Sequence, residues 1–133
     1  MKITLMLFLF SFCAIINIMG QEKTWIDGNG KSTTKENAAF YSVLSTDKKD
    51  NKLIVIYYIS GNKALESYLI NGKKHGKSLE FYVTGEVKTT GDFKVGLKEG
   101  MWKTYYENGK IREKGKYLKG EKTGIWKTYY KND

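Results

Sequence analysis

Apolar and polar residues alternate in short runs from residue 52 onward, and glycines interrupt these runs at regular intervals. Written in register, the runs form three blocks of 24 residues, 52–75, 76–99 and 100–123, followed by the half-block 124–133. Alternation with a period of two predicts β-strands, and a pair such as Asn108-Gly109 predicts a tight hairpin turn. Each block is therefore expected to form a β-hairpin.

Glycine and aromatic residues recur at the same places in successive blocks, so we interpret the chain as a tandem repeat. Most of the glycines fall in predicted turns. Gly91 and Gly115 instead fall inside strands, where glycine is unfavourable unless an aromatic ring lies across the bare backbone. The glycines with predicted structural roles in turns and strands are Gly61, Gly85, Gly91, Gly100, Gly109, Gly115, Gly120 and Gly124.

The same alternation separates the side chains of the predicted sheet into two groups. It places Trp102, Tyr106 and Ile111 on an aromatic face and Lys114 and Lys116 on a basic face. Stacked rings in successive hairpins would stabilise a sheet that no second sheet covers. Residues predicted to bind a partner are Trp102, Tyr105, Tyr106, Tyr117, Trp126, Tyr129, Tyr130, Arg112, Lys114 and Lys116.

The segment 21–50 does not follow the repeat, and we expect it to cap the first edge of the array. Thr33 and Glu36 have the spacing of a capping box, which predicts a short helix from Glu36 to Phe40. The predicted fold class is mainly β, a single-layer antiparallel sheet of tandem 24-residue hairpins behind this cap. The array is assigned to 51–133, about three and a half repeats.

Residues 1–20 have one basic residue, an apolar run and a small residue, Gly20, before polar Gln21. This pattern predicts a secretory signal peptide cleaved after Gly20 and export to the periplasm or the extracellular space. Outer-membrane association stays open. A lipoprotein signal with Cys13 as the acylated residue is disfavoured, because bulky Phe12 precedes the cysteine. A buried N-terminal helix is the remaining alternative.

Charge is concentrated on the array. The 133-residue chain has 23 Lys and Arg against 14 Asp and Glu, and loss of the leader with its Lys2 leaves a net charge of +8. Segment 21–50 has equal numbers of acids and bases, so the whole excess lies in the array. A basic sheet attracts anionic lipid or acidic envelope polymers, although lysines also serve solubility alone. Nucleic acid is disfavoured, because Arg112 is the single arginine.

The residue inventory does not favour catalysis. One His and one Cys are too few for a two-histidine metal site or a disulfide framework. His75 falls in a predicted turn, and no carboxylate pair recurs in a way that suggests acid–base chemistry. We therefore expect neither an enzyme nor a cofactor or metal.

The block GMWKTYYENGKIREKGKYLKGEKTG (100–124) resembles the repeat of the MORN-repeat variant family, bacterial proteins with tandem β-hairpins. Ile54 and Ser78 depart from the family pattern at the tryptophan position, and Ser67 departs at the interior glycine. Segment 24–41 is similar to leaders of secreted Bacteroidetes-type members. The resemblance implies membrane or lipid contact, protein scaffolding, or the antitoxin role with which family members are often labelled.

Export, repeats and the missing catalytic residues together predict a non-enzymatic module that binds or scaffolds another cell-envelope protein. Peripheral binding to an anionic membrane or envelope polymer is one alternative. Neutralisation of a partner toxin by direct binding is a second alternative, and self-association through sheet edges also stays open.

Overall fold

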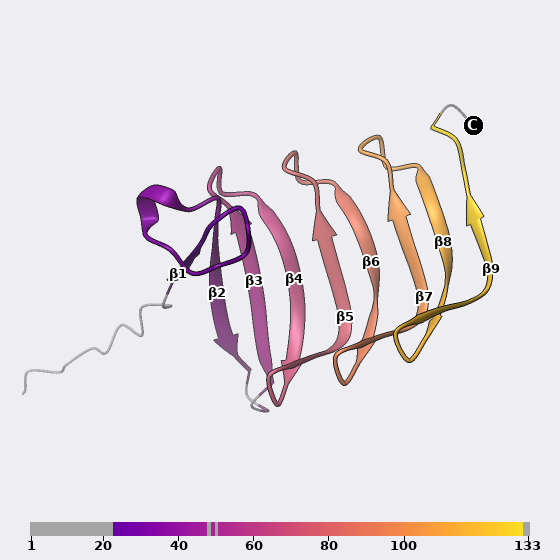
Figure 1. Cartoon of the computed structure of the whole chain (residues 1–133), viewed down its shortest axis with the longest axis horizontal. Helices are drawn as coiled ribbons and strands as arrows, with labels where there is room; N and C mark the ends of the chain where they lie inside the picture. The colour runs from indigo at the N-terminus through magenta and orange to yellow at the C-terminus, as the bar shows by residue number, and fades with distance from the viewer. Residues whose placement is uncertain (1–22, 48, 50, 132–133) are drawn as a thin grey trace, which may run out of the picture.

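One antiparallel sheet of nine strands makes up nearly all of the described chain, in which each strand pairs with the next in sequence order (Figure 1). The computed structural model describes residues 23–47, 49 and 51–131. The sheet is open and mainly β, as predicted. Its strands are β1 (Lys23–Ile26), β2 (Phe40–Thr46), β3 (Lys52–Tyr58), β4 (Lys63–Ile70), β5 (Lys73–Phe81), β6 (Val87–Lys94), β7 (Leu97–Tyr105), β8 (Ile111–Leu118) and β9 (Glu121–Thr128).

Glycine-containing turns connect β3 to β4, β5 to β6 and β7 to β8 in the same way. In the last of them the Tyr106 N–H donates to the Lys110 carbonyl at 2.9 Å, and the Gly109 N–H donates back to the Tyr106 carbonyl at 2.9 Å. Gly109 has a φ of 81°, a conformation in which a side chain is strained. The sequence therefore forms a tight hairpin at this point.

Residues paired across antiparallel strands point to the same face of the sheet. Successive pairings create one continuous row, here called the Val43–Lys127 row, and the face that carries it is called the lysine face. The row consists of Val43, Val55, Glu66, Leu79, Thr90, Lys103, Lys114 and Lys127, one residue from each strand from β2 to β9.

The opposite face, called the aromatic face, carries a row of rings in edge-to-face contact: Phe93 to Trp102 at 5.1 Å between centroids, Trp102 to Tyr117 at 5.9 Å, and Tyr117 to Trp126 at 5.1 Å. The Trp102 ring lies across Gly91, where an added Cβ would come within 2.2 Å of ring atoms. The Trp126 ring lies across Gly115 in the same way. The expected packing reason for the interior glycines is confirmed.

Tyrosine hydroxyls connect each hairpin to the next. The hydroxyls of Tyr58, Tyr82 and Tyr106 donate to backbone carbonyls 23 residues further along the chain, at 2.9, 2.7 and 2.8 Å. These hydrogen bonds fix the spacing of the hairpins at one end of the sheet, because each one spans a strand to reach its acceptor.

The segment before the hairpins joins the sheet as β1 and β2, and the loop between them folds back on β1. The Thr33 N–H donates to the Trp25 carbonyl at 3.0 Å, and Ile26 forms a bridge with Ser32, so the loop covers the outer edge of β1. The predicted helix is a 3-10 turn, Lys35–Asn37, preceded by Thr34 without a side-chain cap. The predicted capping box is wrong, because Thr33 pairs with β1.

The predicted signal peptide, its cleavage at Gly20 and the alternative at Cys13 lie outside the described residues. Among the residues that are described, no helix has the length and apolar character needed to span a membrane.

Candidate binding faces of the sheet

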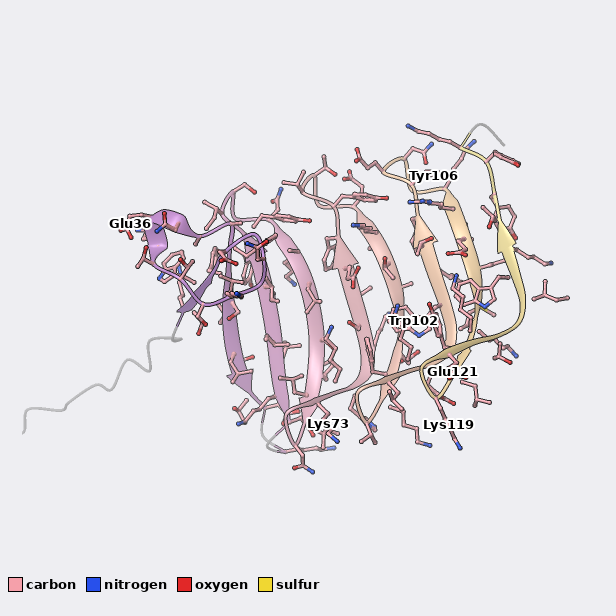
Figure 2. All side chains as sticks on the ribbon, in the orientation of Figure 1. Glu36, Lys73, Trp102, Tyr106, Lys119 and Glu121 are labelled. Atoms are coloured by element: carbon pink, nitrogen blue, oxygen red, sulfur yellow. The ribbon has the colours of Figure 1, made fainter. Side chains whose placement is uncertain are left out.

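The ten residues predicted to bind a partner do not form one surface. Three rings line the aromatic face, four residues lie on the lysine face, and three lie at the hairpin end of the sheet. Figure 2 shows Trp102 within the sheet and Tyr106 near a hairpin turn. The aromatic face holds Trp102, Tyr117 and Trp126; the lysine face holds Tyr105, Tyr129, Lys114 and Lys116; the hairpin end holds Tyr106, Tyr130 and Arg112.

The rings of the aromatic face stabilise the sheet itself. Trp102 is only 4% exposed, and its Nε1 donates to the Asp92 carbonyl at 3.1 Å. Tyr117 lies edge-on between Trp102 and Trp126. At the hairpin end, the Tyr106 hydroxyl donates a hydrogen bond to the Tyr129 carbonyl. Because these contacts occupy the rings, they leave little of Trp102 for a ligand.

Lysines also cover the aromatic face, which corrects the expected division into one aromatic and one basic face. The Lys98 Nζ lies 4.4 Å from the Trp102 ring centroid, and the Lys122 Nζ lies 4.0 Å from that of Trp126. Lys74 covers Phe93 at 5.0 Å. These cation–π contacts shield rings that no second sheet covers. These three lysines lie 24 residues apart in the sequence, so the repeat itself indicates that they occupy equivalent positions.

Ile111 lies on the lysine face, whereas the alternation pattern predicts it on the aromatic face. Thr104 pairs with Glu113, whereas Tyr105 pairs with Ile111, so one extra residue is inserted in β8 at a bulge. Ile111 therefore faces the same side as Tyr105 and lines a hollow on the lysine face with Lys114 and Tyr129. Strict alternation misses this, because a bulge shifts the register by one residue.

Lys103, Lys114 and Lys127 stand side by side on three neighbouring strands. Directly opposed residues have Cβ atoms only about 5 Å apart, so like charges in this arrangement repel. Neither salt bridge found among the described residues, Lys63–Glu66 or Lys122–Glu113, involves any of these three lysines, although Glu66 lies further along the Val43–Lys127 row. An anion beside the row would relieve the repulsion.

Next to these lysines the lysine face is hollowed, with a volume of about 460 Å³. Lys116 borders the hollow, and Met101 and Ile125 line it with side chains 45% and 82% exposed. The sequence prediction included Lys114 and Lys116 but missed Lys103, Lys127 and the two apolar residues. Pairing register, which the alternation pattern does not contain, brings these residues together.

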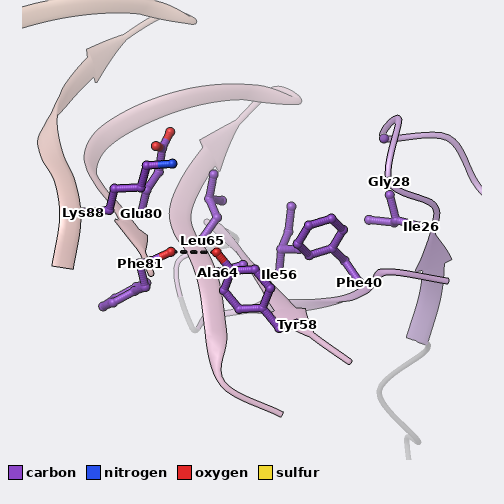
Figure 3. A pocket seen from close by; sticks show the side chains of 11 residues that line it. Ile26, Gly28, Phe40, Ile56, Tyr58, Ala64, Leu65, Glu80, Phe81 and Lys88 are labelled. Atoms are coloured by element: carbon purple, nitrogen blue, oxygen red, sulfur yellow. Dashed lines mark hydrogen bonds between the residues drawn. The ribbon is translucent and has the colours of Figure 1, made fainter. Parts of the chain in front are cut away.

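A second hollow, of about 340 Å³, lies on the other face at the opposite end of the sheet. Figure 3 shows Phe40, Ile56 and Tyr58 along it, with Glu80 and Lys88 at one side. The Tyr58 hydroxyl donates a hydrogen bond to the Phe81 carbonyl and so helps to join neighbouring hairpins (Figure 3). Apart from Glu80 and Lys88 the lining of this hollow is uncharged, and no row of lysines lies beside it.

The titratable groups of the described residues do not gather into a metal site or a catalytic cluster. In residues 23–47, 49 and 51–131 no group of three or more His, Cys, Asp or Glu side chains could hold a metal ion. The Thr84 side chain, by a hydrogen bond, lowers the pKa of Glu86, and the hydrogen bond to Glu66 raises the pKa of Lys63. His75 accepts from the Val95 N–H at 3.3 Å. These contacts lie within a turn, within β4 or between β5 and the residue that follows β6, and do not gather titratable groups into one site.

Fold and surface together define an open, single-layer antiparallel sheet with one face bearing a lysine row and a hollow. No family model, curated protein or solved structure matches the chain. The geometry of this surface is therefore the basis for proposing a function.

Proposed function

We propose that the protein is a non-catalytic binding module that holds another protein of the cell envelope through the lysine face of β7–β9. The observation that supports this proposal best is the row Lys103–Lys114–Lys127, which has no acidic partner in the described chain and borders a partly apolar hollow. Charged residues around exposed apolar side chains are typical of protein-binding surfaces.

We infer a cleaved leader, 1–20, a mature protein in the periplasm or outside the cell, and a 24-residue repeat that occurs about three and a half times in 51–133. The hydroxyl donors Tyr58, Tyr82 and Tyr106 lie 24 residues apart and make equivalent hydrogen bonds, which supports this repeat length. Resemblance to the MORN-repeat variant family supports a scaffolding role.

Cross-linked capture from envelope fractions tests the proposal. The native protein is compared with a row variant that carries Lys103→Glu, Lys114→Glu and Lys127→Glu. A control variant carries Lys31→Glu, Lys49→Glu and Lys52→Glu, which change the net charge equally at the other end of the sheet. We expect the native and control proteins to capture the same partner, and the row variant to lose it. Absence of any partner above background, or equal capture by all three, would contradict the proposal.

Binding to an anionic membrane is the second candidate, because exposed Ile125 and Met101 lie beside the lysines as in a membrane-surface contact. Sedimentation with anionic and neutral vesicles at low and high salt decides this candidate. Salt-sensitive binding to anionic vesicles alone, lost in the row variant, would support it. Equal recovery with both kinds of vesicle would exclude it.

A further inference from the structure

The outer side of β9 has no partner strand among the described residues, whereas the comparable strand β7 pairs on both sides. The two strands share a sequence pattern, GMWKTYY in 100–106 and GIWKTYY in 124–130. All of β9 except Trp126 is exposed, and Ile125 is 82% exposed against 45% for Met101 at the same place in β7. An uncovered edge presents unpaired backbone groups to another strand.

From this comparison we infer that β9 accepts an extended segment of the partner protein, with a carboxylate opposite Lys127, as a tenth strand. The inference rests on the proposed function, for which it names the place of binding and the chemistry of the bound segment. Strand addition uses backbone hydrogen bonds for affinity and alternate side chains for specificity.

The pairing of β7 with β8 indicates what such a segment would contain. On that side, Lys103 pairs with Lys114 and Gly100 pairs with Tyr117, without interruption from Gly100 to Thr104. A tenth strand in the same register would place one residue opposite Lys127, at the end of a row that already has three lysines. A carboxylate is favoured there, because opposite charges attract across strands and a fourth ammonium would add repulsion.

The same register specifies the other face of the segment. The residue opposite Gly124 would point to the aromatic face, as Tyr117 does opposite Gly100. Tyr117 contacts Trp102 edge to face at 5.9 Å, and an aromatic residue of the segment would reach Trp126 in the same way. The expected segment therefore has a carboxylate and, three residues later, an aromatic ring.

The other edge of the sheet is unsuitable for strand addition. β1 is four residues long, and the loop already occupies half of its outer side, through the Thr33 N–H at Trp25 and Ser32 at Ile26. Strand addition is therefore restricted to the β9 edge.

Two labelled peptides test the inference by fluorescence anisotropy. The first, Ile-Arg-Glu-Glu-Gly-Lys-Tyr-Leu, has the sequence of β8 with glutamate in place of Lys114, and the second has the β8 sequence itself. We expect the glutamate peptide to bind about tenfold more tightly at low salt, because an attractive pair replaces a repulsive one. High salt should narrow the difference.

A charge swap provides the decisive comparison. In the Lys127→Glu variant the preference should reverse toward the lysine peptide, and in the Lys31→Glu control it should stay as in the native protein. Circular dichroism verifies that the variants fold. Weak binding of both peptides, or a preference unchanged by Lys127→Glu, would overturn strand addition. If envelope capture persists in that case, the proposed function stands without it; if capture fails too, both fall.

Discussion

The two ends of the Val43–Lys127 row are built differently, although they belong to one sheet. At the N-terminal end Val43 and Val55 are buried, 9% and 8% exposed. At the C-terminal end the row continues as Lys103, Lys114 and Lys127. Packing on both faces stabilises the first end. The second end relies on rings on one face, and its other face is available for binding.

Aromatic rings follow the same division. In the N-terminal half, rings pack on both faces: Tyr41 and Tyr57 stack at 5.0 Å between centroids on the side that carries Val43 and Val55, and Phe40 contacts Tyr58 at 5.3 Å on the opposite side. In the C-terminal half the ring row that includes Trp102 lies on the opposite face. At the C-terminal end, therefore, the ring packing comes from the face opposite the three lysines.

The largest expected effect comes from replacing Gly91 with alanine. The new Cβ would collide with the Trp102 ring, which is 4% exposed and has no room to move, so Gly91→Ala should lower the free energy of unfolding by about 3 kcal/mol. Urea denaturation measures the change. Gly28→Ala, where the Cβ meets nothing within 4 Å, is the matched control and should be nearly neutral. A stability loss under about 1 kcal/mol for Gly91→Ala would show that the ring packing is not needed.

Loss of one inter-hairpin hydrogen bond should have a smaller effect. Tyr82→Phe removes the hydroxyl that donates to the Tyr105 carbonyl at 2.7 Å and should cost about 1 kcal/mol in thermal or urea unfolding. Tyr68→Phe is the control, because the Tyr68 side chain is 42% exposed and its hydroxyl makes no hydrogen bond within the described residues. Equal effects of the two substitutions would contradict a role for the bond in joining hairpins.

Reversing one charge of the lysine row should stabilise the protein slightly. Lys114→Glu places a carboxylate between Lys103 and Lys127 and should raise the free energy of unfolding by about 0.5 kcal/mol at low salt. Thermal melts at low and high salt provide the measurement, because screening should remove the gain. A loss of stability that salt leaves unchanged would mean that Lys114 acts through packing on Tyr129 and not through charge.

The smallest expected effect concerns acid and the turn between β2 and β3. The Asp47 carboxylate accepts hydrogen bonds from the Asn51 side chain and from the backbone N–H groups of Asn51 and Lys49. These bonds, the Asn51 side chain having the largest effect, lower the pKa of Asp47. Since the folded pKa lies below the unfolded value, this contribution is present at neutral pH and is lost as pH falls through the folded pKa. Melting temperatures between neutral and acidic pH should therefore fall less in Asp47→Asn than in the native protein. Parallel curves for the two proteins would contradict this assignment.

The hairpins from residue 52 onward could be predicted from the sequence, because alternation and turn glycines are local signals. Trp102 across Gly91 could also be anticipated, since an interior glycine needs a reason. The position of Ile111 could not be predicted, because a bulge leaves no mark in the alternation. Lys103 and Lys127 were missed because only pairing register shows that they meet Lys114.

Segment 21–50 illustrates the same limit. Its turn residues and apolar run indicated a cap, but the pairing of β1 with β2 depends on contacts that form only in the folded sheet. The 3-10 turn at Lys35–Asn37 replaces the predicted helix, because Thr33 is used in pairing with Trp25. Tertiary pairing overrides a local capping signal here.

Hydrogen exchange of the backbone amides of β7 and β9, measured with and without the glutamate peptide, tests most directly that the C-terminal edge is the binding surface. In the protein alone, β9 amides should exchange faster than those of β7, because one side of β9 is unpaired. The peptide should slow exchange in β9 and leave β1 and β2 unchanged. Equal protection of β7 and β9 without peptide, or peptide-induced protection at the N-terminal end, would contradict the account.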